Sequence, residues 1–185
     1  MTNKYLIVVD MQNDFVIGSL GTKEAQNIVQ STVQKINHFR GRVIFTKDTH
    51  EEHYLSMYEG KILPIRHCIS DTPGWQLVAD LEKIQMEKNW PVYLKPVFGS
   101  VKLAQDLQSI HKSNPIREIE LIGVCTDVCV VSNALLLKAH LPEVPIWVDV
   151  SCCAGTTPHK HTSALETMKS CQIMIRKEMV FHDAV

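Results

Sequence analysis

The stretch EIELIGVCTDVCVV, residues 118–131, passes from a short apolar strand into the start of an amphipathic helix. Residues 118–122 have the length and apolar content of a buried strand, and apolar residues recur at helical spacing after Cys129. This cysteine is therefore expected in the first turn of the helix. Unpaired N–H groups and the positive end of the macrodipole at a helix start favour a thiolate and can hold a developing oxyanion. The stretch predicts a nucleophilic cysteine, with a small buried cysteine that closes a packed turn as the alternative.

Strand-like and helix-like segments alternate along the rest of the chain. The expected strands are residues 5–9, 42–46, 92–94, 118–122, 145–150 and 172–175, and the expected helices are residues 25–39, 101–111, 129–140 and 158–170. This alternation predicts an α/β fold in which a six-stranded, mainly parallel sheet lies between two layers of helices. We expect a single domain over residues 1–185 in the Rossmann-like strand order 3-2-1-4-5-6, with ligands bound beyond the carboxyl ends of the strands.

Composition excludes several classes of partner. The 185 residues carry a formal net charge of −1 and a pI of about 6.7, so the chain lacks the basic surplus that nucleic acid or an anionic membrane attracts. Six cysteines, two of them adjacent at positions 152 and 153, fit reduced thiols better than a disulfide scaffold. The apolar run near the first residue is too short for a signal peptide, and no window approaches a membrane span. We therefore expect a cytoplasmic protein with a small-molecule or protein partner.

Three residues with acidic, basic or nucleophilic side chains stand at strand ends. Asp10 follows the first strand, Lys95 follows the third, and Cys129 comes just after the fourth. A thiol is only a few per cent ionised at pH 7, so it gains from a neighbouring base such as Asp10 and from a cation such as Lys95. Each of the two also has an ordinary explanation, Asp10 as the cap of a turn and Lys95 as a charge at a strand end.

A long irregular stretch, residues 47–73, follows the second strand and contains Asp48, His50, His53 and His67. A loop of this length in a compact domain is commonly functional. Two imidazoles and one carboxylate suit zinc, iron or manganese and leave coordination positions for water. The stretch therefore predicts a metal site, with turn formation and solvated histidines as the alternative.

Four motifs resemble those of the isochorismatase-like cysteine hydrolases. They are VVDMQNDF at residues 8–15, KPVFGS at 95–100, GVCTDVCV at 123–130 and CAGTTPHKH at 153–161. Their order and spacing are together far more specific than any single motif, and the resemblance extends over residues 4–175. Within that superfamily, the segments DTH at 48–50 and PIRHC at 64–68 are similar to the metal loop of the nicotinamidase branch.

The resemblance implies an Asp-Lys-Cys triad and a divalent metal ion held by three side chains. By this match the triad consists of Asp10, Lys95 and Cys129, and the ligands of zinc, or alternatively of iron or manganese, are Asp48, His50 and His67. The second cysteine of the motif at 123–130 is then the nucleophile. In relatives a cis peptide bond joins the positions of Val124 and Cys125, so the backbone N–H groups of Cys125 and Cys129 are expected to face the oxyanion.

The resemblance also implies the activity, which is release of ammonia from a small carboxamide through a thioester, as in nicotinamidases. Phe15 matches an aromatic residue of the family's substrate pocket, and Tyr54 and Val124 are further candidates for its lining. Nicotinamidases commonly place a tryptophan before the metal-loop histidine, whereas residues 62–66 here read ILPIR. Another small amide or an N-carbamoyl compound is therefore an alternative substrate. Family members are often homo-oligomers, and we expect one here.

Three rival functions explain fewer of the residues. Vinyl-ether hydrolysis of the isochorismatase type needs no nucleophilic cysteine, so Cys129 argues against it. A metal-free amidase of the carbamoylsarcosine type is disfavoured because all three metal-ligand candidates are present. A thiol redox or binding module that uses Cys125 and Cys129 leaves Asp10 and Lys95 unexplained.

Overall fold

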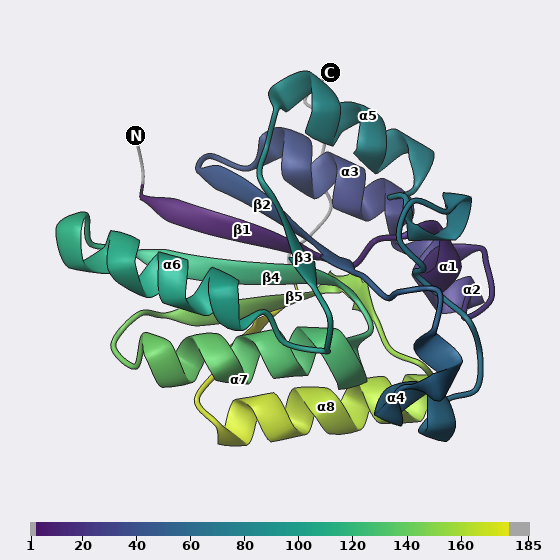
Figure 1. Cartoon of the computed structure of the whole chain (residues 1–185). Coiled ribbons are helices and arrows are strands. Elements are labelled where there is room, and N and C mark those ends of the chain that lie inside the picture. Colours follow the sequence, from purple (N-terminus) through teal and green to yellow (C-terminus); the bar gives the residue numbers. More distant parts are fainter. Residues whose placement is uncertain (1–2, 178–185) are drawn as a thin grey trace.

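The computed structural model describes residues 3–177, which form one α/β domain around a six-stranded sheet (Figure 1). All strand pairs are parallel, and the strand order is β3-β2-β1-β4-β5-β6. The strands are β1 (Lys4–Val9), β2 (Arg42–Asp48), β3 (Val92–Lys95), β4 (Glu118–Val124), β5 (Ile146–Ala154) and β6 (Met174–Arg176). The predicted fold class and strand order are confirmed. Residues 1–2 and 178–185 of the expected domain lie outside the described residues.

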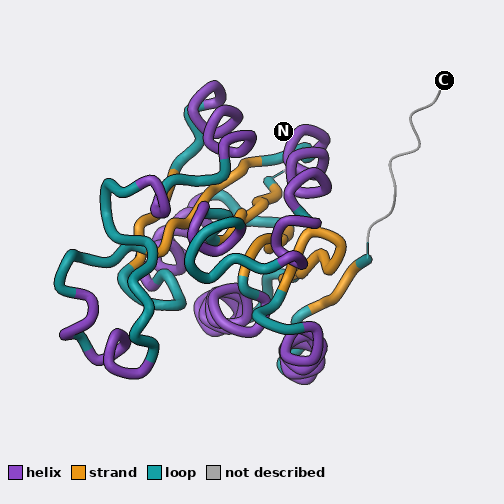
Figure 2. Tube along the Cα trace, turned by 90° about the vertical axis from the view of Figure 1, so that its right-hand side faces the viewer, coloured by secondary structure: helices purple, strands orange, loops and turns teal. Residues whose placement is uncertain are grey.

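Helices cover both faces of the sheet. They are α1 (Asn13–Val16), α2 (Lys23–Asn27), α3 (Val29–His38), α4 (Tyr58–Ile62), α5 (Ala79–Lys88), α6 (Val101–Ser113), α7 (Val131–His140) and α8 (Pro158–Ser170). Helices α3 and α5 lie on one side, and α6, α7 and α8 lie on the other (Figure 1). The view turned by 90° shows the strands between these two groups of helices (Figure 2). Within residues 3–177, none of the helices has the length and apolar character needed to cross a membrane.

The side chains of β1 alternate between two hydrophobic cores. Tyr5, Ile7 and Val9 belong to the core that contains apolar residues of α6, α7 and α8. Leu6 and Val8 belong to the other core, which contains residues of α3 and α5. All five side chains are buried. Because successive strand residues point to opposite faces, a continuously apolar strand is what a sheet covered on both sides requires.

Gly123 lets β4 approach β1 closely at the end of the strand. Its φ is +114°, which side chains rarely allow, and a Cβ at this position would collide with the Val9 carbonyl oxygen. The register between β4 and β5 also shifts between Leu121 and Gly123. These features end the regular strand and lead the chain into the turn that carries Cys129.

Two helical boundaries differ from the sequence expectation. The helix expected over residues 25–39 is interrupted at Ile28, which separates α2 from α3. Helix α5 has no counterpart in the expectation, because Leu81 is its only buried residue and its apolar repeat is correspondingly weak. The stretch 47–73 is only partly irregular, since β2 extends to Asp48 and α4 forms within it.

Strand β5 is longer than its apolar pattern indicates. The sequence predicts that it ends at residue 150, but the strand continues through the polar residue Ser151 to Ala154. Lys35 Nζ lies 3.0 Å from Asp149 Oδ2, and Ser151 Oγ donates to Asp149 Oδ1 at 2.6 Å. These partners offset the cost of burying the Asp149 carboxylate within the strand. Beyond it, Cys152, Cys153 and Ala154 are buried again.

Candidate functional site

Lys95, the last residue of β3, lies at the centre of a buried group of reactive side chains. Its Nζ atom is 2.7 Å from Asp10 Oδ2 and 3.0 Å from Asp48 Oδ1. It also donates to Cys129 Sγ at 3.4 Å. Lys95 pairs in register with Asp48 on β2, and Asp10 directly follows β1. The carboxyl ends of neighbouring strands thus bring together the three residues that the sequence predicts as a triad.

Asp10 is oriented by its own backbone and by β2. Its φ of +47° lies in the left-handed region, which aspartate tolerates better than most residues do. Its Oδ1 accepts a hydrogen bond from Thr46 Oγ1 at 2.6 Å, and its N–H donates to the Thr46 carbonyl at 3.2 Å. The second carboxylate oxygen, Oδ2, therefore faces Lys95.

Burial and the neighbouring charges together set the protonation of these groups. It raises the pKa of Asp10 against the lowering effect of Lys95, and it raises the pKa of the Cys129 thiol well above its usual range. Burial opposes the charge of Lys95, but the surrounding acidic groups outweigh it and raise the pKa of this ammonium. The resting site therefore holds a charged lysine and a protonated thiol. The helix-start effect expected to favour a thiolate is outweighed, so a base has to remove the thiol proton.

Cys129 lies in a π-helical turn, Thr126–Val130, rather than in a regular α-helix. Helix α7 follows directly at Val131, so Cys129 lies in the first turn of a continuous helical segment, as expected, although this segment starts at Thr126 and its first turn is π-helical. The Cys125 carbonyl accepts hydrogen bonds from two N–H groups inside the turn, both at 3.0 Å. The peptide bond between Val124 and Cys125 is cis, as expected. The turn therefore places Cys129 beside the end of β4, next to Lys95.

Asp48, His50 and His67 form a second buried group, whose nitrogen and oxygen donor atoms all lie within 4.8 Å of one another. Asp48 Oδ2 is 2.9 Å from His50 Nε2 and 3.6 Å from His67 Nε2. Burial opposes the charge of Asp48, but the two histidines and Lys95 outweigh it and hold the pKa of this carboxyl well below its usual range. Asp48 thus joins the two groups, since its other oxygen faces Lys95. His53 is exposed and lies outside the group.

The donor set fits a divalent cation. His50 Nε2 is buried and makes no hydrogen bond within the described part of the chain, although Asp48 lies close to it. His67 Nδ1 lies 2.8 Å from the Ile65 carbonyl. If Nδ1 carries the proton that this carbonyl accepts, Nε2 of His67 presents a lone pair to the group. Two imidazole nitrogens and one carboxylate are donors that zinc, iron and manganese bind.

The motif at residues 8–15 also holds the metal-ligand candidates in place. Gln12 Nε2 donates to the Asp48 carbonyl at 2.8 Å, and Gln12 Oε1 accepts from the Asp48 N–H at 2.7 Å. Asp14 Oδ2 accepts from the Cys68 N–H at 2.8 Å, next to His67. The motif therefore positions both flanks of the metal-ligand group in addition to supplying Asp10.

Glu59, on α4, also faces the two histidines, although no motif indicates it. Its Oε1 lies 3.8 Å from His50 Nε2 and 4.0 Å from His67 Nε2. Burial and the charge of Asp48 raise the pKa of Glu59, against the lowering effect of the histidines. The only signal in the sequence is that Glu59 is a carboxylate within the histidine-rich stretch. Because this stretch contains several carboxylates, the sequence does not single out Glu59.

A cavity of about 170 Å³ lies between the two groups. It is lined by Phe15, Leu20, Asp48, Glu59, Leu63, His67, Phe98, Cys125, Val128, Cys129 and Thr156. The thiol and two of the metal-ligand candidates therefore face one space, whose remaining walls are mainly apolar. A small ligand in this cavity reaches both groups at once.

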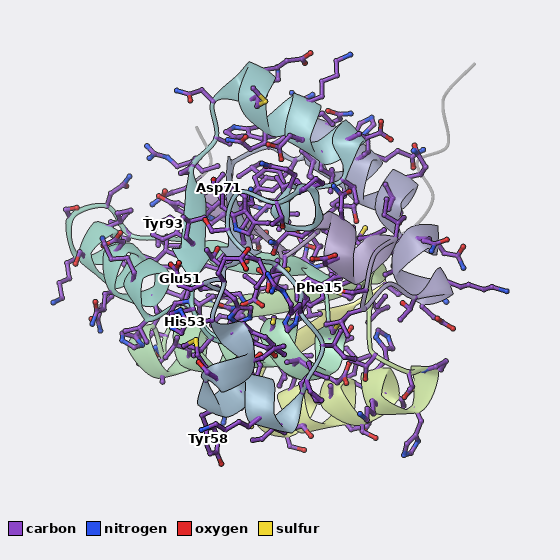
Figure 3. The ribbon with its side chains drawn as sticks, turned by 45° about the vertical axis from the view of Figure 1, so that its right-hand side comes forward. Phe15, Glu51, His53, Tyr58, Asp71 and Tyr93 are labelled. Carbon is purple, nitrogen blue, oxygen red and sulfur yellow. The ribbon has the colours of Figure 1, made fainter. Side chains whose placement is uncertain are left out.

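The three residues predicted for a substrate pocket have different positions. Phe15 lines the cavity, and Figure 3 labels its side chain. Tyr54 and Val124 are fully buried and are not among the lining residues. The ring of Tyr54 instead packs against the imidazoles of His50 and His67, with centroids 4.6 Å and 5.0 Å away. Tyr54 thus contacts the metal-ligand candidates rather than the cavity.

Leu63 occupies part of the cavity wall in the segment where an aromatic residue is missing. Arg66, in the same loop, pairs with Glu52 and is largely exposed. Tyr58 points away from the molecule (Figure 3). The wall that residues 62–66 supply is therefore aliphatic, since Leu63 is the residue of this segment that lines the cavity.

Comparisons with known proteins show the family to which the chain is related. Residues 4–179 match the family model described as the isochorismatase domain. An uncharacterized isochorismatase family protein of Bacillus subtilis is 31% identical over 173 residues, which cover 88% of this chain and 92% of that protein. The nicotinamidase/pyrazinamidase of Mycobacterium tuberculosis is 24% identical over 184 residues, which cover 91% of this chain and 95% of that enzyme.

Solved structures give the same result. The crystal structure of Pyrococcus horikoshii pyrazinamidase in complex with zinc superposes with a TM-score of 0.79 at 29% identity, covering 95% of this chain and 99% of that one. The pyrazinamidase/nicotinamidase of Streptococcus mutans superposes with a TM-score of 0.80 at 25% identity, covering 94% and 99%. The chain therefore belongs to the isochorismatase domain family, and it resembles nicotinamidases and pyrazinamidases along its length.

Proposed function

We propose that the protein is a metal-containing cysteine amidohydrolase that releases ammonia from a small, uncharged carboxamide through a thioester, in the manner of a nicotinamidase. The observation that carries this proposal is the position of Lys95 Nζ, 2.7 Å from Asp10 and 3.4 Å from the Cys129 thiol. A base and a nucleophile that both contact one cation beside a small cavity are what acyl transfer from an amide needs.

In the proposed mechanism, Asp10 moves the protons and Cys129 forms the covalent bond. Asp10 accepts the thiol proton while Cys129 Sγ attacks the amide carbonyl. The ammonium of Lys95 stabilises the negative charge on the Asp10 carboxylate and on the sulfur. The backbone N–H groups of Cys125 and Cys129 are assigned to the oxyanion. Asp10 then protonates the leaving nitrogen, so ammonia departs and an acyl thioester remains. A water that loses its proton to Asp10 hydrolyses this thioester and restores the thiol.

Asp48, His50 and His67 are assigned to a divalent cation, for which zinc is our first choice and iron or manganese the alternatives. A bound cation would supply a Lewis acid and an attachment point for a donor atom of the substrate. Glu59 adds a second carboxylate that faces the same histidines. Because Asp48 also contacts Lys95, its position is fixed from the triad side as well.

Zinc binding is expected to depend on His67 and not on His53. Wild-type protein dialysed against zinc should retain about one ion per chain, and His67→Ala should retain none, because one of three donors is lost. His53→Ala is the matched control, since His53 is exposed in the same loop. Elemental analysis after dialysis measures the stoichiometry. A wild-type protein without zinc, or equal zinc in both variants, would contradict the assignment.

The substrate class is tested by ammonia release from nicotinamide, pyrazinamide, aliphatic amides and N-carbamoyl amino acids. We expect turnover of uncharged carboxamides, because the cavity walls carry no lysine or arginine to pair with a carboxylate. Arg66, which could have filled that role, pairs with Glu52 instead. Hydrolysis restricted to the N-carbamoyl amino acids would favour the carbamoyl amidase alternative.

A thiol redox or binding module remains the non-enzymatic alternative. Burial raises the pKa of Cys125 to about 12 and that of Cys129 well above its usual range, which disfavours thiol–disulfide exchange at neutral pH. Both thiols are free in the structure. A cytoplasmic location and a homo-oligomeric state stay predictions from the sequence and the family resemblance.

A further inference from the structure

Asn133 is a buried polar residue on α7 that none of the motifs includes. It is 1% exposed, and its side chain makes three hydrogen bonds to backbone groups. Nδ2 donates to the Cys129 carbonyl at 2.8 Å and to the Phe98 carbonyl at 3.1 Å, and Oδ1 accepts from the Ser100 N–H at 2.9 Å. One side chain therefore connects the turn that carries the thiol with the loop that follows β3.

The connected loop carries two parts of the site. It begins at Lys95, whose ammonium contacts the Cys129 thiol, and it includes Phe98, whose side chain lines the cavity. Ser100 ends the loop and caps α6, where its Oγ accepts from the Leu103 N–H at 3.3 Å. The loop is thus fixed at Lys95 by the sheet, at Ser100 by α6, and between them by Asn133.

We propose that Asn133 is a positioning residue that holds the Lys95 loop and the Cys129 turn in register, so that the ammonium, the thiol and the Phe98 wall keep their mutual positions. The expected effect on catalysis rests on the proposed amidase function, whereas the structural role of Asn133 does not. An amide side chain suits the role because it offers donors and an acceptor on one short stem. The bonds to the Ser100 N–H and to the Cys129 carbonyl are buried, so their loss costs more free energy than the loss of an exposed hydrogen bond.

Ser132, the residue before Asn133, provides a matched comparison. Its Oγ donates to the Val128 carbonyl, four residues earlier, at 2.6 Å. It therefore bonds the same turn without reaching the loop. The same geometry indicates that a serine at position 133 can still bond the Cys129 carbonyl but not Phe98 or Ser100. Asn133→Ser therefore removes the hydrogen bonds to the loop but keeps the one that stabilises the helix start.

The experiment compares Asn133→Ser and Asn133→Leu with Ser132→Ala and wild type, each assayed well below its unfolding temperature. For ammonia release from nicotinamide, we expect kcat to fall about 10-fold or more in both Asn133 variants, because small misplacements of reacting groups have large kinetic effects. We expect KM to rise as Phe98 shifts. Ser132→Ala should stay within about 3-fold of wild type in both constants, since it removes only a bond inside the turn.

The rate of Cys129 alkylation by iodoacetamide, followed by fragment-ion mass spectrometry, gives a readout that does not need amidase activity. We expect alkylation at pH 7 to slow about 5-fold in Asn133→Ser, because a thiol farther from Lys95 ionises less readily. If wild type releases no ammonia from any amide, the proposed function fails while this comparison still tests Asn133. Unchanged kcat, KM and alkylation rate in a folded Asn133→Ser variant would overturn the inference.

Discussion

Replacing Cys129 with alanine is expected to reduce ammonia release by at least about 10⁴-fold, because the variant has no nucleophile to form the thioester. The zinc content should stay the same, since Cys129 is not part of the group formed by Asp48, His50 and His67. Steady-state ammonia assays and elemental analysis of the same preparations measure both quantities. The two measurements together distinguish the covalent role of the thiol from metal binding.

Cys125→Ala is the matched control for this prediction. Cys125 lines the same cavity and lies at the other end of the same turn, but only its backbone N–H is assigned a role. We expect this variant to keep more than about a third of the wild-type kcat, because alanine retains that N–H. Equal inactivity of both variants would mean that the wrong thiol is assigned or that the two act as a pair.

Lys95→Met is expected to lower the free energy of unfolding by roughly 3–5 kcal/mol and to reduce kcat by at least about 100-fold. Methionine matches the length of the lysine side chain but leaves the buried carboxylates of Asp10 and Asp48 without their shared cation. The buried thiol also loses its contact with the ammonium. Urea titration measures the stability, and the ammonia assay measures the activity.

Lys47 supplies the control for this substitution. It is also a buried lysine near the end of a strand, but its ammonium lies 3.2 Å from the centroid of the Trp75 ring and donates to Gln76 Oε1 at 3.1 Å. Lys47→Met therefore removes a cation–π contact and a neutral hydrogen bond, and we expect a loss of about 1 kcal/mol. Equal stability losses in the two variants would contradict the role given to the Asp10–Lys95–Asp48 contact.

The sheet and the triad could be predicted because they depend on local patterns. Each strand is an apolar run, and parallel strands place the residues that follow them at one edge of the sheet. Asp10, Lys95 and Cys129 therefore meet where the sequence indicates. Helix α5 could not be predicted in this way, because its apolar repeat is weak and Leu81 is its only buried residue.

The details of the site depend on contacts between distant segments, which no local pattern encodes. Glu59 reaches the histidines only because α4 folds back over them, and Tyr54 packs on the imidazoles instead of lining the cavity. Asn133 joins a helix to a loop more than thirty positions earlier in the chain. The protonation of Cys129 also reverses the expectation from its helix start, because burial outweighs the helix dipole.

The central claim is that an acyl group passes through Cys129. The most direct measurement is acid quenching of the wild-type protein within its first turnover of nicotinamide, followed by fragment-ion mass spectrometry of the peptide that contains residues 118–138. We predict a nicotinoyl thioester on Cys129 that appears with the first equivalent of ammonia. An acyl group on another residue, or a burst of ammonia without any acyl group on Cys129, would contradict the account.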